Sequence, residues 1–270
     1  MSTSGLMKGK RGLIMGVANG HSIAWGIADV LHKAGAELAF TYAGETFKKR
    51  VEPLVAPLNP AAVMDCDVTQ QGSIDACFEE LRKKWDSIDF LVHAIAFSDK
   101  NQLQGRYIDT TPENFQNTIN ISAYSFTAVA QRAEKMMTKG GSMVTLTYYG
   151  AEKVMPHYNV MGVAKAALEA STRYMAEDLG KQNIRVNSIS AGPIKTLSFA
   201  GISDSRYILK WNELNSPLRR AVSIEEVGNT ALYLLSDLGS AVTGENIHVD
   251  AGYHVVGMKA VDAPDIAVVK

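Results

Sequence analysis

Short apolar runs alternate with amphipathic stretches along almost the whole chain. Short apolar runs bounded by glycine or polar residues predict buried strands, whereas apolar residues that recur with the helical period predict amphipathic helices. The predicted strands cover residues 11–16, 36–42, 61–68, 88–96, 141–147, 184–192 and 245–252. The predicted helices cover residues 22–35, 45–58, 73–85, 111–137, 156–180 and 223–238.

Particular residues mark where these helices should begin and end. Ser22 stands at the N-cap of the first helix, and Gly35 closes it. Pro112 falls in the first turn of its helix, where the missing backbone N–H is tolerated. Gly180 is expected to close the helix at 156–180. Pro53 and Pro57 are expected to shorten the helix at 45–58, because proline cannot donate the helical hydrogen bond.

The order of these elements predicts the fold class. Strands this apolar are typical of a parallel sheet that is buried on both faces, and strand–helix alternation is typical of an α/β fold. We therefore expect residues 1–270 to form a single-domain, doubly wound (Rossmann-like) seven-stranded parallel sheet with helices on both faces. One irregular insertion is expected at about 192–222, a segment long enough to cover a binding site.

Composition and charge exclude several other classes. Hydrophobic residues make up 46% of the chain and charged residues 20%, and the formal net charge is -1. These values fit a globular protein with a sizeable core, and they give no support for binding nucleic acid or an acidic membrane. The two cysteines, Cys66 and Cys77, are too few for a disulfide framework, and no spacing around them resembles a zinc site. The chain shows no signal peptide or membrane-spanning run, so we expect a cytoplasmic protein without a metal.

A glycine-rich turn follows the first predicted strand. Gly16, Gly20 and Gly26 permit a tight turn, close approach of a ligand and close helix packing. The amides at the start of the next helix then face outward, where a pyrophosphate would bind. The strict G-x-G-x-x-G pattern is absent, so the alternative of a turn built only for packing stays open.

The end of the second strand bears on the choice of dinucleotide. Glu45 is the only acid near it, and no arginine stands there to meet a 2′-phosphate, so NADH is preferred over NADPH. After the third strand, Asp67 and Val68 are placed to bond the edge of an adenine. An acid that caps its own turn explains Asp67 equally well.

Tyr158 and Lys165 are seven residues apart in the helix predicted at 156–180. Seven helical residues span about 10 Å along the axis, whereas four span about 6 Å. Short-chain dehydrogenases that reduce ketones have their tyrosine four residues before the lysine. The longer spacing suits an electrophile whose reacting carbon and oxygen are separated by conjugation. The alternative is that the two residues only share a packing face.

Several segments together resemble one family. They include "GVANGHSIAWGIA", "HAIAFS", "YGAEKVMPHYNVMGVAKAALEASTRYMA", "VNSISAGPIKTL" and "VTGENIHVDAGY", and they span about residues 8 to 257. With them the chain resembles the bacterial NADH-dependent enoyl-[acyl-carrier-protein] reductases of the short-chain dehydrogenase/reductase superfamily. The Tyr-x6-Lys spacing and "SAGPIKTL" are the most discriminating features. The chain departs from the family pattern at Ala96, often a glycine, and at Asn120.

The resemblance implies roles for individual residues. It implies that Tyr148, Tyr158 and Lys165 form the catalytic group and that Lys165 holds the nicotinamide ribose. It places Gly16, Ser22 and Ile23 at the pyrophosphate, Ala43 at the adenosine ribose, Asp67 and Val68 at the adenine, Ile95 beside the cofactor, and Ile194, Lys195, Thr196, Leu197 and Ser198 around the carboxamide. It also implies that Ser98, Tyr148 and Tyr158 contact the substrate.

The implied activity is NADH-dependent reduction of the trans-2 double bond of enoyl thioesters on acyl carrier protein, the last step of each fatty-acid elongation cycle. The resemblance also implies a homotetramer. Two other functions are considered. A carbonyl reductase of the same superfamily would need a tyrosine where Met161 stands, and a non-catalytic dinucleotide sensor would not need Tyr158 and Lys165 together.

The segment at 192–222 contains apolar and basic side chains. Phe199, Ile202, Tyr207, Ile208, Leu209 and Trp211 are candidates to cover an acyl chain, and an ordinary helix packed on the core is the alternative. Lys195, Arg206, Lys210, Arg219 and Arg220 suit docking of an acidic carrier protein, although a solvated set of charges explains them equally well.

Overall fold

The computed structural model describes residues 4–196, 199 and 203–264. One seven-stranded parallel sheet runs through the molecule in the order β3-β2-β1-β4-β5-β6-β7. Its strands are β1 (Arg11–Met15), β2 (Glu37–Tyr42), β3 (Ala62–Asp65), β4 (Phe90–His93), β5 (Gly141–Thr147), β6 (Ile184–Ala191) and β7 (Asn246–Val249). The predicted doubly wound α/β fold is confirmed.

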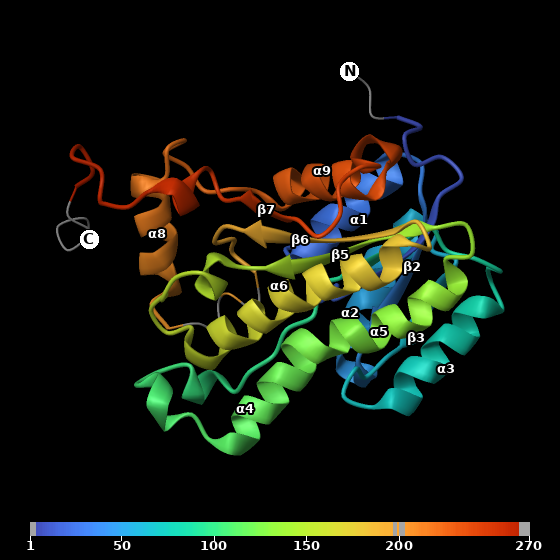
Figure 1. The fold of residues 1–270 in the computed structure, drawn as a ribbon, viewed down its shortest axis with the longest axis horizontal. Helices are drawn as coiled ribbons and strands as arrows, with labels where there is room; N and C mark the ends of the chain where they lie inside the picture. Colours follow the sequence, from blue (N-terminus) through green and yellow to red (C-terminus); the bar gives the residue numbers. More distant parts are fainter. Residues whose placement is uncertain (1–3, 197–198, 200–202, 265–270) are drawn as a thin grey trace.

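Helices cover both faces of this sheet (Figure 1). Helices α1 (Ile23–Lys33), α2 (Gly44–Val55) and α9 (Ile224–Leu235) contribute to the core on one face. Helices α3 (Gln71–Arg82), α5 (Ser125–Ala133) and α6 (Asn159–Gly180) contribute to the core on the other. Helix α4 (Pro112–Ile119) precedes α5. Helix α8 (Ser205–Asn215) stands at one end of the molecule, beside the C-terminal part of the chain.

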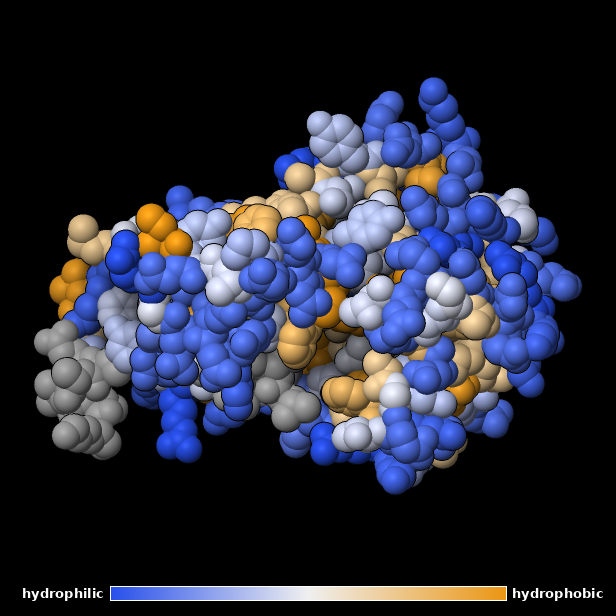
Figure 2. Space-filling model, turned by 90° about the horizontal axis from the view of Figure 1, so that it is seen from below, coloured by the Kyte–Doolittle hydropathy of each residue, from blue (hydrophilic) through white to orange (hydrophobic). Residues whose placement is uncertain are grey.

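The surface seen in Figure 2 is largely hydrophilic, and hydrophobic side chains are exposed in a hollow near its middle. None of the helices in the described part of the chain combines the length and the apolar character that crossing a bilayer requires.

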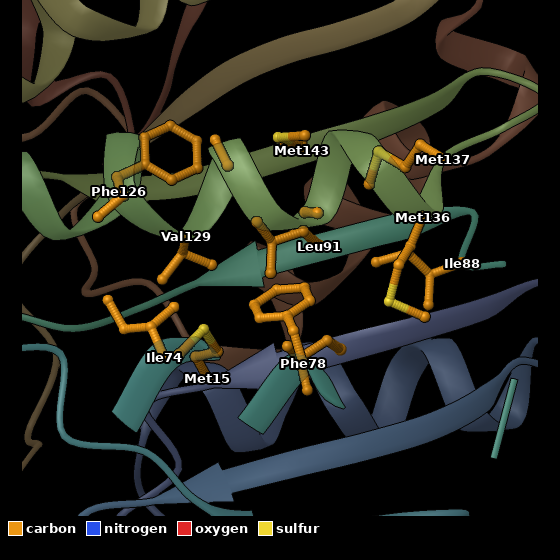
Figure 3. Packing of buried hydrophobic residues seen from close by; sticks show 14 of the residues in the cluster. Met15, Ile74, Phe78, Ile88, Leu91, Phe126, Val129, Met136, Met137 and Met143 are labelled. Atoms are coloured by element: carbon orange, nitrogen blue, oxygen red, sulfur yellow. The ribbon is translucent and has the colours of Figure 1, made fainter. Parts of the chain in front are cut away.

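The core between α3, α5 and the sheet is built from large apolar side chains. Figure 3 shows Phe78 and Ile74 of α3 facing Leu91 of β4 and Val129 of α5. All four side chains are fully buried. Burial of a side chain of this size contributes about 1.5–3 kcal/mol, so this layer fixes α3 and α5 against the strands.

Two predicted helices differ from their observed form. Helix α2 passes through Pro53, because Val51 and Val55 are fully buried and hold the helix to the core on both sides of that proline, and it ends at Val55, before Pro57. The helix predicted at 111–137 is confirmed with Pro112 in its first turn, but a π-helical turn at Asn120–Tyr124 interrupts it.

Helix α6 begins later than the sequence predicts. The helix was predicted from residue 156, but it begins at Asn159, and Tyr158 is its N-cap. His157 and Asn159 adopt positive φ values of 55° and 34°, so the chain turns sharply into the helix at this point. Tyr158 therefore stands before the helix, and its distance from Lys165 does not follow from the helical rise alone.

Candidate active site

A cavity of about 490 Å³ lies at the carboxyl ends of the central strands. It is lined by Gly16 after β1, Ala94 after β4, Leu146 and Thr147 at the end of β5, and Ala191 at the end of β6. The chain order reverses between β1 and β4, since β2 and β3 lie on one side of β1 and β4 to β7 on the other. Ligands of doubly wound sheets bind at such a switch point.

The glycine turn brings α1 close to this cavity. Gly16 has a φ of +101°, and a Cβ at this position would stand 2.1 Å from the carbonyl oxygen of Ala94. Only glycine therefore fits here without displacing the backbone after β4. The Ser22 hydroxyl accepts hydrogen bonds from the backbone N–H groups of Ala18 and Asn19, both at 3.0 Å.

Ser22 is the N-cap of α1, as predicted, but its hydroxyl closes the preceding loop and makes no side-chain cap to the helix. Ile23 and Ala24 of the first turn line the cavity. Helix N-terminal amides that no side chain caps attract anionic groups. These residues therefore fit a pyrophosphate at the start of α1.

Two tyrosines of the cavity lining are in contact. The rings of Tyr148 and Tyr158 are 5.0 Å apart between centroids and meet edge to face at 77°. Burial raises the pKa of both phenols above the ordinary value, so both hold their protons at neutral pH. In the described part of the chain, the buried Tyr148 Oη has no hydrogen-bond partner. A buried hydroxyl of this kind is costly unless a ligand pairs with it.

Two glycines hold the Tyr158 ring in place. A Cβ on Gly150 would lie 2.4 Å from Cδ1 of Tyr158, so the ring packs directly on the backbone of the turn after β5. A Cβ on Gly162 would lie 2.7 Å from the carbonyl oxygen of Gly150, so α6 packs closely against the same turn. The position of the phenol therefore depends on the absence of side chains at residues 150 and 162.

Lys165 projects from α6 into the same cavity. Its Nζ donates a hydrogen bond to the carbonyl oxygen of Leu146 at 2.7 Å. Burial lowers the pKa of Lys165 to about 8, and the carboxylate of Glu169 opposes this shift. The ammonium is thus the dominant form at neutral pH but titrates within reach of ordinary assays.

Helix α4 and the π-helical turn hold the loop after β4. Ser122 Oγ accepts a hydrogen bond from the Phe97 N–H and donates one to the Phe97 carbonyl oxygen. Thr118 Oγ1 donates to Ser98 Oγ at 2.8 Å, and Asn114 Oδ1 accepts from the Asp99 N–H at 3.1 Å. The Ser98 hydroxyl is therefore bound within the protein, which leaves its backbone as the group for a ligand.

The structure brings most of the predicted site residues together. The cavity lining includes Gly16, Ser22, Ile23, Ile95, Ser98, Tyr148, Tyr158, Lys165, Ile194 and Thr196. Ala43, Asp67, Val68 and Lys195 do not line it, and Leu197 and Ser198 lie outside the described residues.

Asp67 follows β3, farther along the same edge of the sheet. Its Oδ1 accepts hydrogen bonds from the N–H and the hydroxyl of Thr69, at 2.9 and 2.7 Å. This is the turn-capping arrangement that the sequence left open as an alternative. The contact with adenine stays a prediction.

Sequence reasoning missed part of the lining. Ala94, Leu146, Thr147 and Ala191 come from the ends of strands, and the rule that ligands bind at carboxyl ends of parallel strands was a signal for them. Met161 enters the lining from the first turn of α6, and its position four residues before Lys165 was the sequence signal for it.

Phe199 lines the cavity, as expected of a residue that covers the site. The residues of α8 do not line it, and Ile202 lies outside the described residues. Ile208 and Leu209 of this helix are buried, and Trp211 Nε1 donates to the Tyr253 hydroxyl at 3.0 Å. Helix α8 thus packs against the C-terminal part of the chain, which corresponds to the alternative of an ordinary packed helix.

Known proteins are similar to this chain in sequence and in fold. A family model described as Enoyl-(Acyl carrier protein) reductase matches residues 16–254. The chain is 69% identical over 267 residues to the Enoyl-[acyl-carrier-protein] reductase [NADH] 1 of Rhizobium meliloti (strain 1021), covering 99% of this chain and 98% of that protein. It is 60% identical over 264 residues to the second such enzyme of that organism, covering 98% of each.

The solved structure of the enoyl-(acyl-carrier-protein) reductase from Anaplasma phagocytophilum, in complex with NAD, matches this chain with a TM-score of 0.93. The sequences are 60% identical, and the match covers 98% of this chain and 99% of that chain. The family match, the full-length relatives and the shared fold lead to one conclusion: the chain belongs to the enoyl-(acyl carrier protein) reductase family.

Proposed function

We propose that this protein is an NADH-dependent reductase of the trans-2 double bond in enoyl thioesters carried by acyl carrier protein. One observation carries the proposal: Tyr148, Tyr158 and Lys165 line a single cavity at the carboxyl ends of the strands, where the chain order reverses between β1 and β4. Curated relatives with 69% and 60% identity are NADH-dependent enoyl-[acyl-carrier-protein] reductases. The reaction is the last step of each cycle of fatty-acid elongation.

The residues present fit a bound dinucleotide. The Gly16 turn and the uncapped start of α1 would hold the pyrophosphate, and Lys165 would bind the nicotinamide ribose hydroxyls. Ala43, Asp67 and Val68 stand after β2 and β3 at the same edge of the sheet, so we assign the adenosine half to that side of the cavity. Ile194, Lys195, Thr196, Leu197 and Ser198 follow β6, and we assign the carboxamide to them.

NADH supplies the hydride that adds to C3 of the enoyl chain. The Tyr158 phenol donates a hydrogen bond to the thioester oxygen, where negative charge collects as the conjugated system accepts that hydride. Burial raises the pKa of this phenol, which keeps its proton available for donation throughout the neutral range. The Lys165 ammonium adds positive charge on the same side, and protonation of C2 completes the saturated thioester. Removing a positioned donor of this kind costs about 3–4 kcal/mol in the transition state.

Tyr148 and the segment at 192–222 shape the acyl site in this proposal. The unpartnered Tyr148 hydroxyl is available to the substrate, and Phe199 contributes an apolar wall. We propose that the single domain acts as a homotetramer in the cytoplasm and that the basic residues of this segment meet the acidic carrier protein. Reduced, buried Cys66 and Cys77 fit a reducing compartment.

A carbonyl reductase needs a phenol four residues before the lysine. Met161 occupies that position and lines the cavity, so its thioether offers no proton to a ketone. No feature of the site favours that function.

The test follows absorbance at 340 nm with purified protein and four substrate pairs. NADH and NADPH are each combined with a crotonyl thioester and a 3-ketoacyl thioester. We expect NADH to be consumed with the crotonyl thioester and to stay unchanged with the 3-ketoacyl thioester. Consumption only with the ketoacyl substrate would refute the proposal.

A further inference from the structure

Glu169 is a buried carboxylate that no role proposed above uses. It lies four residues after Lys165 on α6, so the two side chains leave the helix on the same face, one turn apart. Lys165 and Glu169 are only 6% and 8% exposed. Charges buried this deeply are costly unless hydrogen bonds or an opposite charge compensate each of them.

The two side chains form hydrogen bonds with consecutive residues at the end of β5. Lys165 Nζ donates to the carbonyl oxygen of Leu146 at 2.7 Å, and Thr147 Oγ1 donates to Glu169 Oε1 at 2.6 Å. Leu146 and Thr147 both line the cavity, whereas Glu169 does not. Glu169 therefore acts on the site through the groups that it holds and through its charge.

The charge of Lys165 depends on few neighbours. Burial lowers its pKa to about 8, and Glu169 is the group that raises it. The phenols of Tyr148 and Tyr158 share the cavity and are held neutral by burial, which raises the pKa of each. His93 of β4 is fully buried, and burial together with the Lys165 charge lowers its pKa to about 3, so it is neutral as well.

Glu169 has charged neighbours of its own. Burial raises its pKa, the hydrogen bond from Thr147 lowers it, and Glu152 raises it again. His248 of β7 and Arg173 of α6 both lower it. The net effect raises the pKa of Glu169 above its ordinary value, whereas the hydrogen bond from Thr147 and the guanidinium of Arg173 favour the ionised carboxylate.

We propose that Glu169 is a positioning residue that keeps Lys165 protonated and holds the end of β5 against α6, so that the ammonium is ready for the cofactor ribose. This inference rests on the proposed use of NADH. It predicts that the loss of the carboxylate makes Lys165 lose its proton at a lower pH. A purely structural role in packing α6 on β5 would leave that titration unchanged.

Loss of the Glu169 carboxylate should lower the pKa of Lys165. Burial already disfavours the charged form of Lys165, and a nearby carboxylate favours it. Without the carboxylate the remaining effect is burial, so the cation is lost earlier as pH rises. Side chains four residues apart on a helix face start about 5–6 Å apart at their Cβ atoms, and an opposite charge within about 4–6 Å moves a pKa by about one unit or more. This sets the size of the expected change.

The test compares Glu169→Gln with Glu177→Gln, which removes the same charge from an exposed position of the same helix. Two readouts are measured against pH: the ¹³Cε chemical shift of Lys165 without cofactor, and the dissociation constant of NADH by fluorescence. For E169Q we expect both midpoints to move down by about one pH unit or more. For E177Q we expect both to stay at the wild-type values. Unmoved midpoints in E169Q would overturn the inference.

Two more variants separate charge from packing. Thr147→Val removes the hydrogen bond to Glu169 but keeps the carboxylate, so the titration of Lys165 should keep its wild-type midpoint. Should E169Q not fold, Glu169→Met replaces it, because an apolar side chain of similar length leaves no unpaired buried amide. A wild-type protein that neither binds NADH nor reduces crotonyl thioesters would refute the proposed function, whereas the Lys165 shift without cofactor tests Glu169 alone.

Discussion

Lys33 and Lys165 each stand four residues from a carboxylate on a helix, and their surroundings shift their pKa values in opposite directions. Lys33 of α1 pairs with Asp29 at 2.7 Å on the surface, where 69% of the lysine side chain is exposed. The hydrogen bond to Asp29 raises the pKa of Lys33, whereas burial lowers the pKa of Lys165 in spite of Glu169. The exposed pair lies on the surface of α1, whose buried apolar side chains hold it to the core. The buried Lys165 has a pKa of about 8 and lines the cavity where the cofactor is expected.

The largest effect is expected from Lys165→Ala. Loss of a charged hydrogen bond to the ribose should weaken NADH binding about 100-fold, which corresponds to the upper range for a hydrogen bond to a charged group. The measurement is the dissociation constant of NADH by fluorescence. Lys33→Ala is the matched control and should bind NADH like the wild type. Wild-type affinity in K165A would show that the lysine has been misassigned.

The same lysine gives opposite pH trends for binding and stability. Its pKa of about 8 in the folded protein lies below the unfolded value of 10.5. NADH affinity should fall as pH rises through about 8, because the ammonium is lost. The unfolded chain binds more protons between pH 8 and 10.5, so the contribution of Lys165 to the free energy of unfolding rises in that window. Urea titrations of wild type and Lys165→Met check this, since the methionine variant should lack that rise.

The next effect concerns Tyr158 and separates chemistry from binding. Tyr158→Phe should lower kcat by about 10²- to 10³-fold, because the oxyanion loses its donor. NADH affinity should change little, since Lys165 remains in place. Tyr149→Phe is the control: its hydroxyl donates to the carbonyl oxygen of His254, away from the cavity lining. Equal kcat values for Y158F and wild type would remove Tyr158 from the mechanism.

A smaller effect is expected where backbone contacts position Tyr158. Gly150→Ala adds a methyl group 2.4 Å from the Tyr158 ring, so the ring must move. Overpacking of this kind costs about 1–3 kcal/mol, and kcat should fall by about tenfold or more as the phenol leaves its place. Gly72→Ala is the control, because nothing lies within 4 Å of its added Cβ. Thermal unfolding and steady-state rates of both variants decide whether the contact matters.

The smallest effect is expected at the exposed Lys33–Asp29 pair, and it tests whether burial distinguishes Lys33 from Lys165. Asp29→Asn removes the exposed partner of Lys33, and solvent already screens that pair. We expect no measurable change in Tm, in NADH affinity or in the pH profile. A change in D29N as large as that in E169Q would mean that burial does not distinguish the two pairs.

The sequence predicted the strands and the location of the site better than the individual contacts within it. The apolar runs located the strands, and the strand order places Gly16, Lys165 and the tyrosines at one edge of the sheet. The start of α6 was missed because the positive φ at His157 and Asn159 has no strong local signal. The bonds of Lys165 to Leu146 and of Glu169 to Thr147 join segments far apart in sequence, so only the folded chain reveals them.

The most direct test of the account follows the hydride itself. The protein is incubated with NADH deuterated on the transferred position and with a crotonyl thioester, and the product is analysed by NMR and mass spectrometry. The account predicts a butyryl thioester with one deuterium at C3. A hydroxylated product, deuterium at another carbon, or an unchanged crotonyl thioester would contradict it.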